Sequence, residues 1–166
     1  MKIQTLSDLM IDLVRDMFDA EKQLIKALPK MVRTASSPHL RRAFETHMEE
    51  TKLHVHRLEE VLELLGQPIR AKKCRAMQCL LDEGKEFFEL DAPADVKDAA
   101  LIAAAQKIEH YEIASYGSLR TWAGLLGEFP IKKLLGDSLA EEKRTDELLT
   151  EIAENVVNAN AEAVAH

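Results

Sequence analysis

Acidic residues stand at positions where the helical pattern of this chain calls for hydrophobic ones. Glu109 and Glu112 lie one helical turn apart, and Ile102 and Tyr116 fall within a narrow arc of the same helical face. A carboxylate that is buried without a partner destabilises a protein by several kcal/mol. The pair must therefore be neutralised by a proton, a basic side chain or a metal ion.

The other long helical segments each place an acidic residue midway along a largely apolar face. Similar spacings from Glu21 to Glu50 and from Glu109 to Glu142 would bring these four residues to one level of an antiparallel helical bundle. His54 and Asp146 each follow one of these glutamates by four residues. The sequence therefore predicts one buried site with the candidate ligands Glu21, Glu50, His54, Glu109, Glu112, Glu142 and Asp146.

Two explanations of this pattern are open. Arg57, Arg120 and tyrosine hydroxyls could satisfy the glutamates as ordinary buried polar residues. However, two arginines cannot balance five glutamates and an aspartate, whereas two divalent ions supply four positive charges. The charge balance therefore favours a dinuclear metal centre, with no further cofactor site and no catalytic residue beyond the metal ligands.

The expected ligands differ in their roles. Glu50 and Glu142 are expected to bridge the two metal ions, and Glu21, Glu109 and Glu112 are expected to bind one ion each. The roles of His54 and Asp146 stay open. Two further histidines of the second helical segment are assigned to a polar face or to hydrogen bonds with ligands, not to the metal ions: His47 and His56.

The elements that position these residues are all helical. A first helix capped by Thr5 or Ser7 is followed by a break at Ser37-Pro38, a typical helix start. No segment has the alternating pattern of a strand. Two pairs of long helices, separated by a crossover that carries a short helix, predict an all-α, ferritin-like four-helix bundle. We expect one domain over residues 1–166, with an ordered core at about 5–156 and a fraying tail at 157–166.

The composition limits the classes of partner. The net charge is −7, from 22 basic and 29 acidic residues, which argues against a nucleic acid or an anionic membrane surface. The first ten residues lack the apolar core of a signal peptide, and no apolar run is long enough to span a membrane. A cytoplasmic location is therefore expected, with Cys74 and Cys79 as reduced thiols.

Several longer phrases resemble the YciE/YciF family of ferritin-like proteins. They are DAEKQLIKALPKM at 19–31, HMEET, RLEEV and, above all, QKIEHYEIASYG at 106–117. The resemblance covers the chain from about residue 5 to 155. It implies a helical bundle that forms a homodimer, an association with bacterial stress responses, and no settled enzymatic activity.

More distantly, the site is similar to that of rubrerythrin-type di-iron proteins. Those proteins carry a glutamate on the first helix, Glu-x-x-His on the second and fourth, and Glu-x-x-Glu on the third. Here Leu53 and Thr145 occupy the two histidine positions. His54 and Asp146 each lie one residue further along the chain. The resemblance thus implies an oxygen-rich site with at most one or two nitrogens. No four-cysteine iron module is present, so an external electron donor protein is implied.

These observations predict a protein that binds two iron ions or, alternatively, manganese. Its chemistry would be that of a peroxidase- or ferroxidase-like oxidoreductase, in which the reduced metal pair reacts with peroxide or oxygen. One alternative is a non-enzymatic stress-response dimer whose metal site is structural or vestigial. The other is a small iron-sequestering protein.

Overall fold

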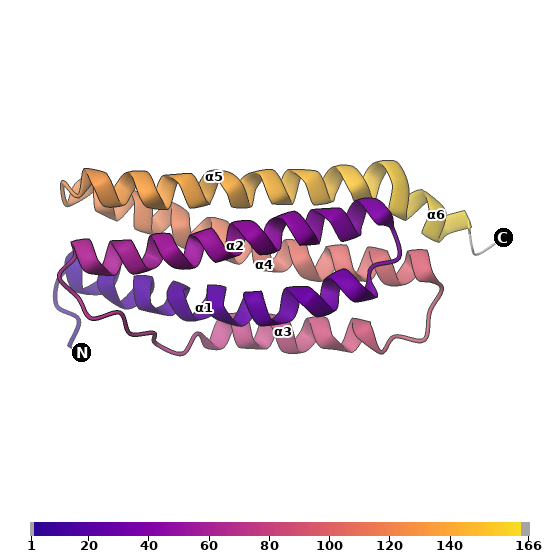
Figure 1. Ribbon diagram of the computed structural model, residues 1–166, viewed down its shortest axis with the longest axis horizontal. Coiled ribbons are helices and arrows are strands. Elements are labelled where there is room, and N and C mark those ends of the chain that lie inside the picture. Colours follow the sequence, from indigo (N-terminus) through magenta and orange to yellow (C-terminus); the bar gives the residue numbers. More distant parts are fainter. Residues whose placement is uncertain (1, 164–166) are drawn as a thin grey trace.

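The computed structural model describes residues 2–163, and these form helices joined by short turns and one long connection (Figure 1). The predicted all-α bundle is confirmed. The elements are α1 (Leu6–Thr34), α2 (Pro38–Leu64), α3 (Arg75–Phe88), α4 (Ala94–Leu125), α5 (Phe129–Ile152), a π-helical turn (Ala153–Val157) and α6 (Asn158–Ala163).

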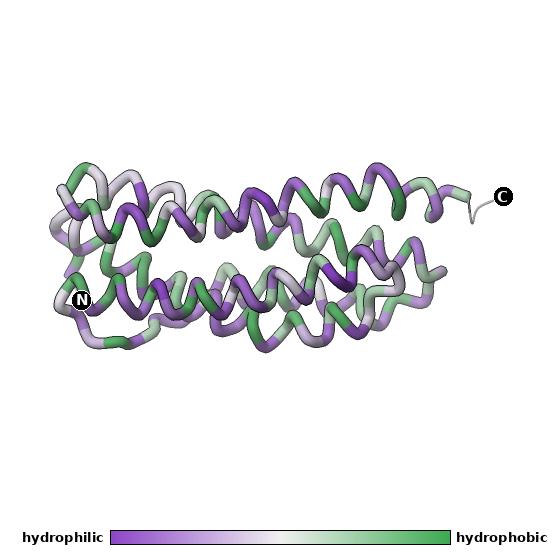
Figure 2. Tube along the Cα trace, turned by 45° about the horizontal axis from the view of Figure 1, so that its top comes forward, coloured by the Kyte–Doolittle hydropathy of each residue, from purple (hydrophilic) through white to green (hydrophobic). Residues whose placement is uncertain are grey.

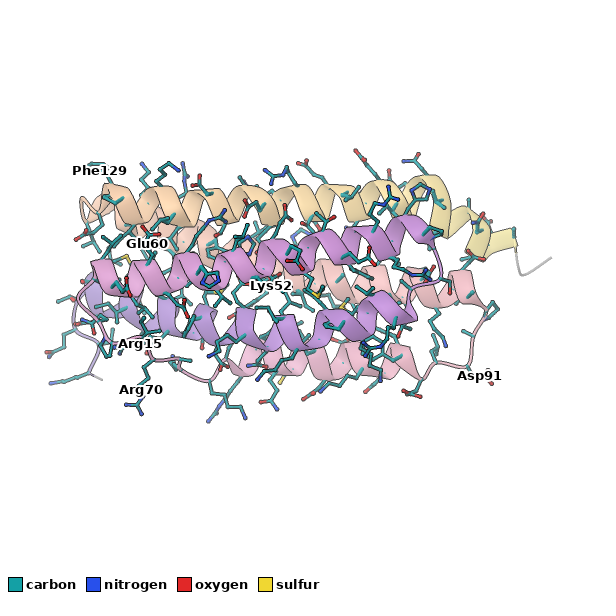
Figure 3. The ribbon with its side chains drawn as sticks, viewed as in Figure 1. Arg15, Lys52, Glu60, Arg70, Asp91 and Phe129 are labelled. Atoms are coloured by element: carbon teal, nitrogen blue, oxygen red, sulfur yellow. The ribbon has the colours of Figure 1, made fainter. Side chains whose placement is uncertain are left out.

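Four long helices form the bundle, and α3 lies against its side. Helix α1 packs against α2 and α4, and α5 packs against α2 and α4, which closes a ring of four. The shorter α3 contacts α1 and α4 within the long crossover (Figure 1). Arg70 and Asp91 mark the two parts of this crossover that precede and follow α3 (Figure 3).

Local sequence signals explain where the first helices begin and end. Thr5 accepts a hydrogen bond from the backbone N–H of Asp8, whose side chain bonds back to the Thr5 N–H, so α1 starts with a capping box. Ser37 caps α2, with Pro38 as its first residue. Gly66, at φ 63°, takes the left-handed conformation that ends α2.

Helix α4 starts without a side-chain cap, because Pro93 occupies the cap position. Instead, the buried carboxylate of Asp98 accepts hydrogen bonds from the backbone N–H groups of Ser36 (2.9 Å) and Ser37 (2.7 Å). This aspartate therefore ties the α1–α2 turn to α4 and fixes the relative register of the two helix pairs.

Hydrophobic residues fill the space between the helices, and each helix alternates between hydrophobic and hydrophilic residues within a turn (Figure 2). Helical structure continues through the π turn and α6 into the segment expected to fray, while residues 164–166 lie outside the described part. Both cysteines are free, and Cys74 is buried at the start of α3. Within residues 2–163, no helix combines the length and the apolarity needed to cross a membrane.

Candidate metal centre

Six ionisable side chains from the four long helices meet inside the bundle. Helices α1 and α5 contribute one glutamate each, α2 contributes two histidines, and α4 contributes two glutamates. None of them is more than 3% exposed. We call this set the Glu/His cluster, and its members are Glu21, His47, His54, Glu109, Glu112 and Glu142.

The cluster divides into two overlapping groups of possible ligands. In the first, which we call the His47 side, ligand atoms of His47, Glu109, Glu112 and Glu142 all lie within 4.8 Å of one another. In the second, the His54 side, the same holds for Glu21, His54 and Glu142. Because Glu142 belongs to both, its carboxylate is placed to bridge two ions.

The distances between the histidine rings and the carboxylates describe how tightly the cluster is packed. His54 Nδ1 lies 2.9 Å from Glu142 Oε1 and 3.4 Å from Glu21 Oε1. His47 Nε2 lies 3.3 Å from Glu109 Oε1, and His47 Nδ1 lies 3.8 Å from Glu142 Oε2. Each ring thus presents at least one nitrogen to the carboxylates.

Most of the buried polar atoms in the cluster make no hydrogen bond to the rest of the described chain. They include both oxygens of Glu112, Oε2 of Glu21 and of Glu109, and the inward nitrogen His47 Nε2. His54 Nδ1 and the Glu142 oxygens have no partner outside the cluster and are compensated only by ion pairs within it. Buried polar atoms are normally hydrogen-bonded, since desolvation without a partner is costly. Convergent unpartnered oxygens and nitrogens are the donor set that a metal ion requires, so these residues fit one.

The surroundings of the two α4 carboxylates favour their neutral form. Burial raises the pKa of Glu109 well above its usual value, and the nearby charge of Glu142 raises it further. Burial likewise raises the pKa of Glu112, with added repulsion from Glu21 and Glu142. Without a cation, the His47 side therefore retains protons that an incoming metal ion would displace.

The His54 side already has compensating charge. Although burial opposes protonation, the neighbouring carboxylates of Glu141, Glu142 and Glu21 raise the pKa of His54 to about 12. Burial acts to raise the pKa of Glu142 as well, but the His54 ring lowers it below the usual value. Burial raises the pKa of Glu21, which also accepts a short hydrogen bond from the Tyr116 hydroxyl.

Residues outside the cluster hold the His54 ring in place. Its Nε2 lies 2.8 Å from Glu141 Oε2, on the side away from the cluster. Arg57 donates two hydrogen bonds to the Glu141 carboxylate and a third, of 3.2 Å, to Ser138 Oγ. Despite partial burial, His54 and Arg57 lower the pKa of Glu141 to about 2. The ionised Glu141 keeps the proton on Nε2 and turns Nδ1 toward Glu21 and Glu142.

The His47 ring has weaker support. Its Nδ1 lies 3.4 Å from the Thr145 hydroxyl, and burial lowers the pKa of the ring, which favours the neutral form. Thr51, one turn along α2, donates a 2.8 Å hydrogen bond to the His47 carbonyl. A neutral ring with an unpartnered Nε2 can serve directly as a metal ligand.

Comparisons with known proteins place this chain in a family. Residues 5–162 match the family described as a domain of unknown function, DUF892. The chain belongs to the DUF892 family. Protein YciF of Escherichia coli strain K12 is 47% identical over 163 residues, which are 98% of each chain.

The solved structures of YciF and of two other proteins are similar to the chain over most of its length. The Escherichia coli stress protein YciF matches with a TM-score of 0.90 and 47% identity, over 94% of this chain and 99% of that one. YcfI from Rhodopseudomonas palustris matches with a TM-score of 0.86 and 41% identity, over 90% and 95%. A Xanthomonas campestris protein at 24% identity, with a TM-score of 0.76, shares the fold.

The structure brings five of the seven predicted ligands together and leaves two outside. Glu21, His54, Glu109, Glu112 and Glu142 lie in the cluster. Glu50 does not: its Oε1 lies 3.4 Å from Arg144 Nη2 near the surface. Asp146 accepts a 3.3 Å hydrogen bond from Gln106 and lies 3.5 Å from the exposed His110.

The placement of Glu50 and Asp146 follows from the register of their helices. We centred the inner face of α2 on Glu50, but it is centred on the fully buried Thr51. One residue turns a helix by about 100°, which carries Glu50 away from the bundle interior. On α5 the predicted inner face is also wrong by one residue, so Thr145 faces the interior where we expected Asp146. The residues that identify the inner face of α2 are its large buried apolar ones: Leu40, Phe44, Leu58 and Leu62.

The threonines account for the unexpected participation of His47. On α2, His54 follows the inward residue Thr51 by three positions. On α5, Thr145 follows the inward residue Glu142 by the same three positions. The residue at that place on α5 is a threonine, which offers no imidazole to the cluster. The His47 ring, from the facing helix α2, contacts Thr145 and reaches Glu142 instead. The sequence signal was the spacing of His47, Thr51 and His54 on one helical face.

Proposed function

We propose that the Glu/His cluster binds two iron or two manganese ions and that the loaded protein reacts with oxygen or peroxide. The observation that carries this proposal is the set of buried, unpartnered carboxylate oxygens arranged as two ligand groups that share Glu142. Charge balance supports it, because four glutamates match two divalent ions. Four carboxylates with two imidazoles suit iron or manganese better than zinc, which favours tetrahedral sulfur and nitrogen sites.

The protein's own residues supply binding, orientation and exclusion of water. One ion would be held by Glu21 and His54, and the other by His47, Glu109 and Glu112. Both ions would be held by Glu142. The Glu141–Arg57 pair would fix the ring of His54, and the surrounding apolar side chains keep bulk water from the cluster. When bound, the metal pair would supply the electrons that oxygen or peroxide accepts.

Metal analysis tests the binding step. Protein produced in iron- and manganese-replete medium should carry two equivalents of one of these metals, and Glu142→Ala should lose both. Glu147→Ala, an acidic change elsewhere on α5, is the matched control and should retain both. Full metal content in Glu142→Ala would contradict the proposed centre.

Kinetics test the redox step. The reduced, iron-loaded protein is mixed with oxygen or with peroxide in a stopped-flow spectrometer, and the appearance of ferric absorption is followed. Oxidation of the bound iron faster than that of free ferrous iron is the expected result. Steady-state peroxide consumption with a chemical reductant then measures the full cycle.

A structural metal centre is the second candidate, and the complete burial of the cluster favours it. In that case the protein would retain its metal and melt at a higher temperature with it, but neither oxidant would change the bound ions. Binding of many iron atoms per chain would instead indicate iron storage.

The partners of the chain are also proposals. We propose a homodimer in the cytoplasm that receives electrons from a separate protein, in line with the family resemblance. Sedimentation velocity over a range of protein concentrations measures the oligomeric state, and a monomer throughout would contradict the dimer.

A further inference from the structure

Two neighbouring cavities lie between the protein surface and the Glu/His cluster. The outer cavity, of about 170 Å³, lies between α1, α3 and α4. The inner cavity, of about 10 Å³, lies against His47 and Glu109. Met31 and Ile108 line both cavities and therefore separate them.

We propose that the outer cavity is the access route for a small, uncharged, apolar molecule of the size of dioxygen. Met31 and Ile108 form the gate to the inner cavity, where the molecule meets the His47 side of the cluster. This inference rests on the proposed function, because the route leads to a metal ion held by His47 and Glu109.

The walls of the outer cavity determine what it can accept. They consist mainly of aliphatic and aromatic groups, while the charged groups are on exposed lysines of α1 and α3. An enclosed cavity of about 150 Å³ with apolar walls binds small apolar molecules or xenon, and the inner walls of this partly open cavity have the same character. Besides the two gate residues, its apolar lining includes Leu80, Leu81, Phe88, Leu101 and Ala104.

The inner cavity lies at the place where a reagent would be needed. Its volume of about 10 Å³ is at the lower limit for one water molecule, so a molecule of the size of dioxygen would enter only when the lining side chains move. His47 Nε2 and Glu109 Oε2, which have no hydrogen-bond partner within the described chain, belong to its lining residues. The remaining walls are apolar, from Leu24, Leu28, Phe44 and Ala105. A molecule here would be next to the His47 side and not the His54 side.

The gate consists of two buried side chains with different stiffness. Met31 is 4% exposed and Ile108 is 3% exposed. Methionine has three rotatable bonds and adapts to a passing molecule, whereas the branched Ile108 side chain is restricted. Passage would therefore depend on motions of Met31, and substitutions at the gate should change rates without changing the ligand set.

The route also gives α3 a role that the four-helix ring does not require. Leu80, Leu81 and Phe88 are only partly buried, yet they form the outer wall of the cavity against α1 and α4. Without this helix, the inner surface of α1 and α4 at Met31 and Ile108 would face solvent. The short helix of the crossover would thus convert an open face into an apolar passage.

Xenon binding tests the cavity without any metal. Metal-free protein is studied under xenon pressure, by crystallography or by xenon NMR. Xenon is expected in the outer cavity of the parent and absent in Leu81→Trp, which fills it. Leu134→Trp, at a partly buried leucine of α5 outside the cavity, is the matched control and should bind xenon as the parent does. Ala104→Leu provides a second filling variant if Leu81→Trp is unstable.

Nitric oxide binding to the ferrous-loaded protein tests the route. A residue that controls passage changes the association and dissociation rate constants by the same factor, so the equilibrium constant stays the same. We expect Leu81→Trp to lower both about tenfold, equivalent to about 1.4 kcal/mol in barrier height. Ile108→Ala should raise both. Leu134→Trp should leave them at parent values.

The outcomes separate this inference from the proposed function. Unchanged rate constants in both filling variants, or no xenon in the parent cavity, would overturn the access route while leaving metal binding in place. A change in the nitric oxide equilibrium constant without matched rate changes would also overturn it, because that result indicates a distorted metal site. A protein that binds no metal would overturn both proposals.

Discussion

The two sides of the Glu/His cluster are built from similar residues but compensated differently. On the His54 side, Glu141 and Arg57 stand behind the ring and its raised pKa keeps it positively charged beside Glu21 and Glu142. On the His47 side, burial favours a neutral ring and protonated Glu109 and Glu112. Without metal, ion pairs hold one side and bound protons the other. One set of ligand types is thus prepared for a cation in two ways.

Metal removal should produce the largest effect and should depend on pH. The raised pKa values of Glu109 and Glu112 favour folding at low pH, and this contribution is lost as pH rises above their unfolded value of about 4.5. The stabilising contribution of His54, whose pKa is raised, is likewise lost as the pH rises above about 6.5. The contribution of Glu141, whose pKa is lowered, stays constant between pH 5 and 8.

Metal-free protein should therefore become less stable from pH 5 to pH 8. Metal binding becomes stronger over that range, because fewer protons compete for the ligands. A hundredfold excess of metal over Kd stabilises by about 2.7 kcal/mol per site, or roughly 5–10 °C in Tm. Calorimetric melting of both forms at several pH values is the measurement. If the difference in Tm between the metal-loaded and metal-free forms does not increase with pH, carboxylates are not the groups that bind the metal.

Glu112→Gln and Glu21→Gln should separate the two sides. Each substitution removes a ligand from one group only, so titration should show one step weakened by about 100-fold or more and the other unchanged. In metal-free protein at pH 8, Glu112→Gln should raise Tm by at least about 2 °C, equivalent to roughly 1 kcal/mol, because the amide needs no proton. At pH 5 this gain should disappear. Weakening of both steps by Glu112→Gln would show that the sides do not act separately.

Glu141→Gln should weaken the His54 side by a smaller amount. The neutral amide no longer stabilises a proton on Nε2, so the pKa of His54 should fall and the ring should lose its fixed orientation. Loss of a partner behind a metal ligand typically lowers affinity 10- to 100-fold. Metal titration measures this effect, and NMR of the imidazole nitrogens follows the pKa and tautomer. Arg57→Gln should give a weaker form of the same change, and an equal loss on the His47 side would contradict the assignment.

Glu50→Gln should have the smallest effect. Its carboxylate meets only the 63% exposed Arg144 at 3.4 Å, and ion pairs of this kind contribute about 0–1 kcal/mol. Metal content, both binding steps and the pH dependence of Tm should match the parent. Loss of one metal equivalent would return Glu50 to the ligand set that its sequence position first suggested.

The helical bundle and most of the acidic site could be predicted from the sequence. Capping residues and breaks at Thr5, Ser37-Pro38 and Gly66 are local signals, and the structure follows them. Glu21, Glu109, Glu112 and Glu142 interrupt apolar faces, and a carboxylate on such a face stands out without knowledge of its neighbours. These features depend on interactions within a few residues or on a simple periodicity.

The face of α2 that turns inward depends on packing between helices and could not be predicted from the sequence. Glu50, Thr51 and His54 offer two polar faces about 100° apart, and the periodicity did not choose between them because both contain apolar residues. Packing of Leu40, Phe44 and Leu58 against the other helices chose the face that carries His47 and Thr51. The pairing of His54 with Glu141 and the cavity behind α3 likewise depend on contacts between residues far apart in the chain, which no local pattern records.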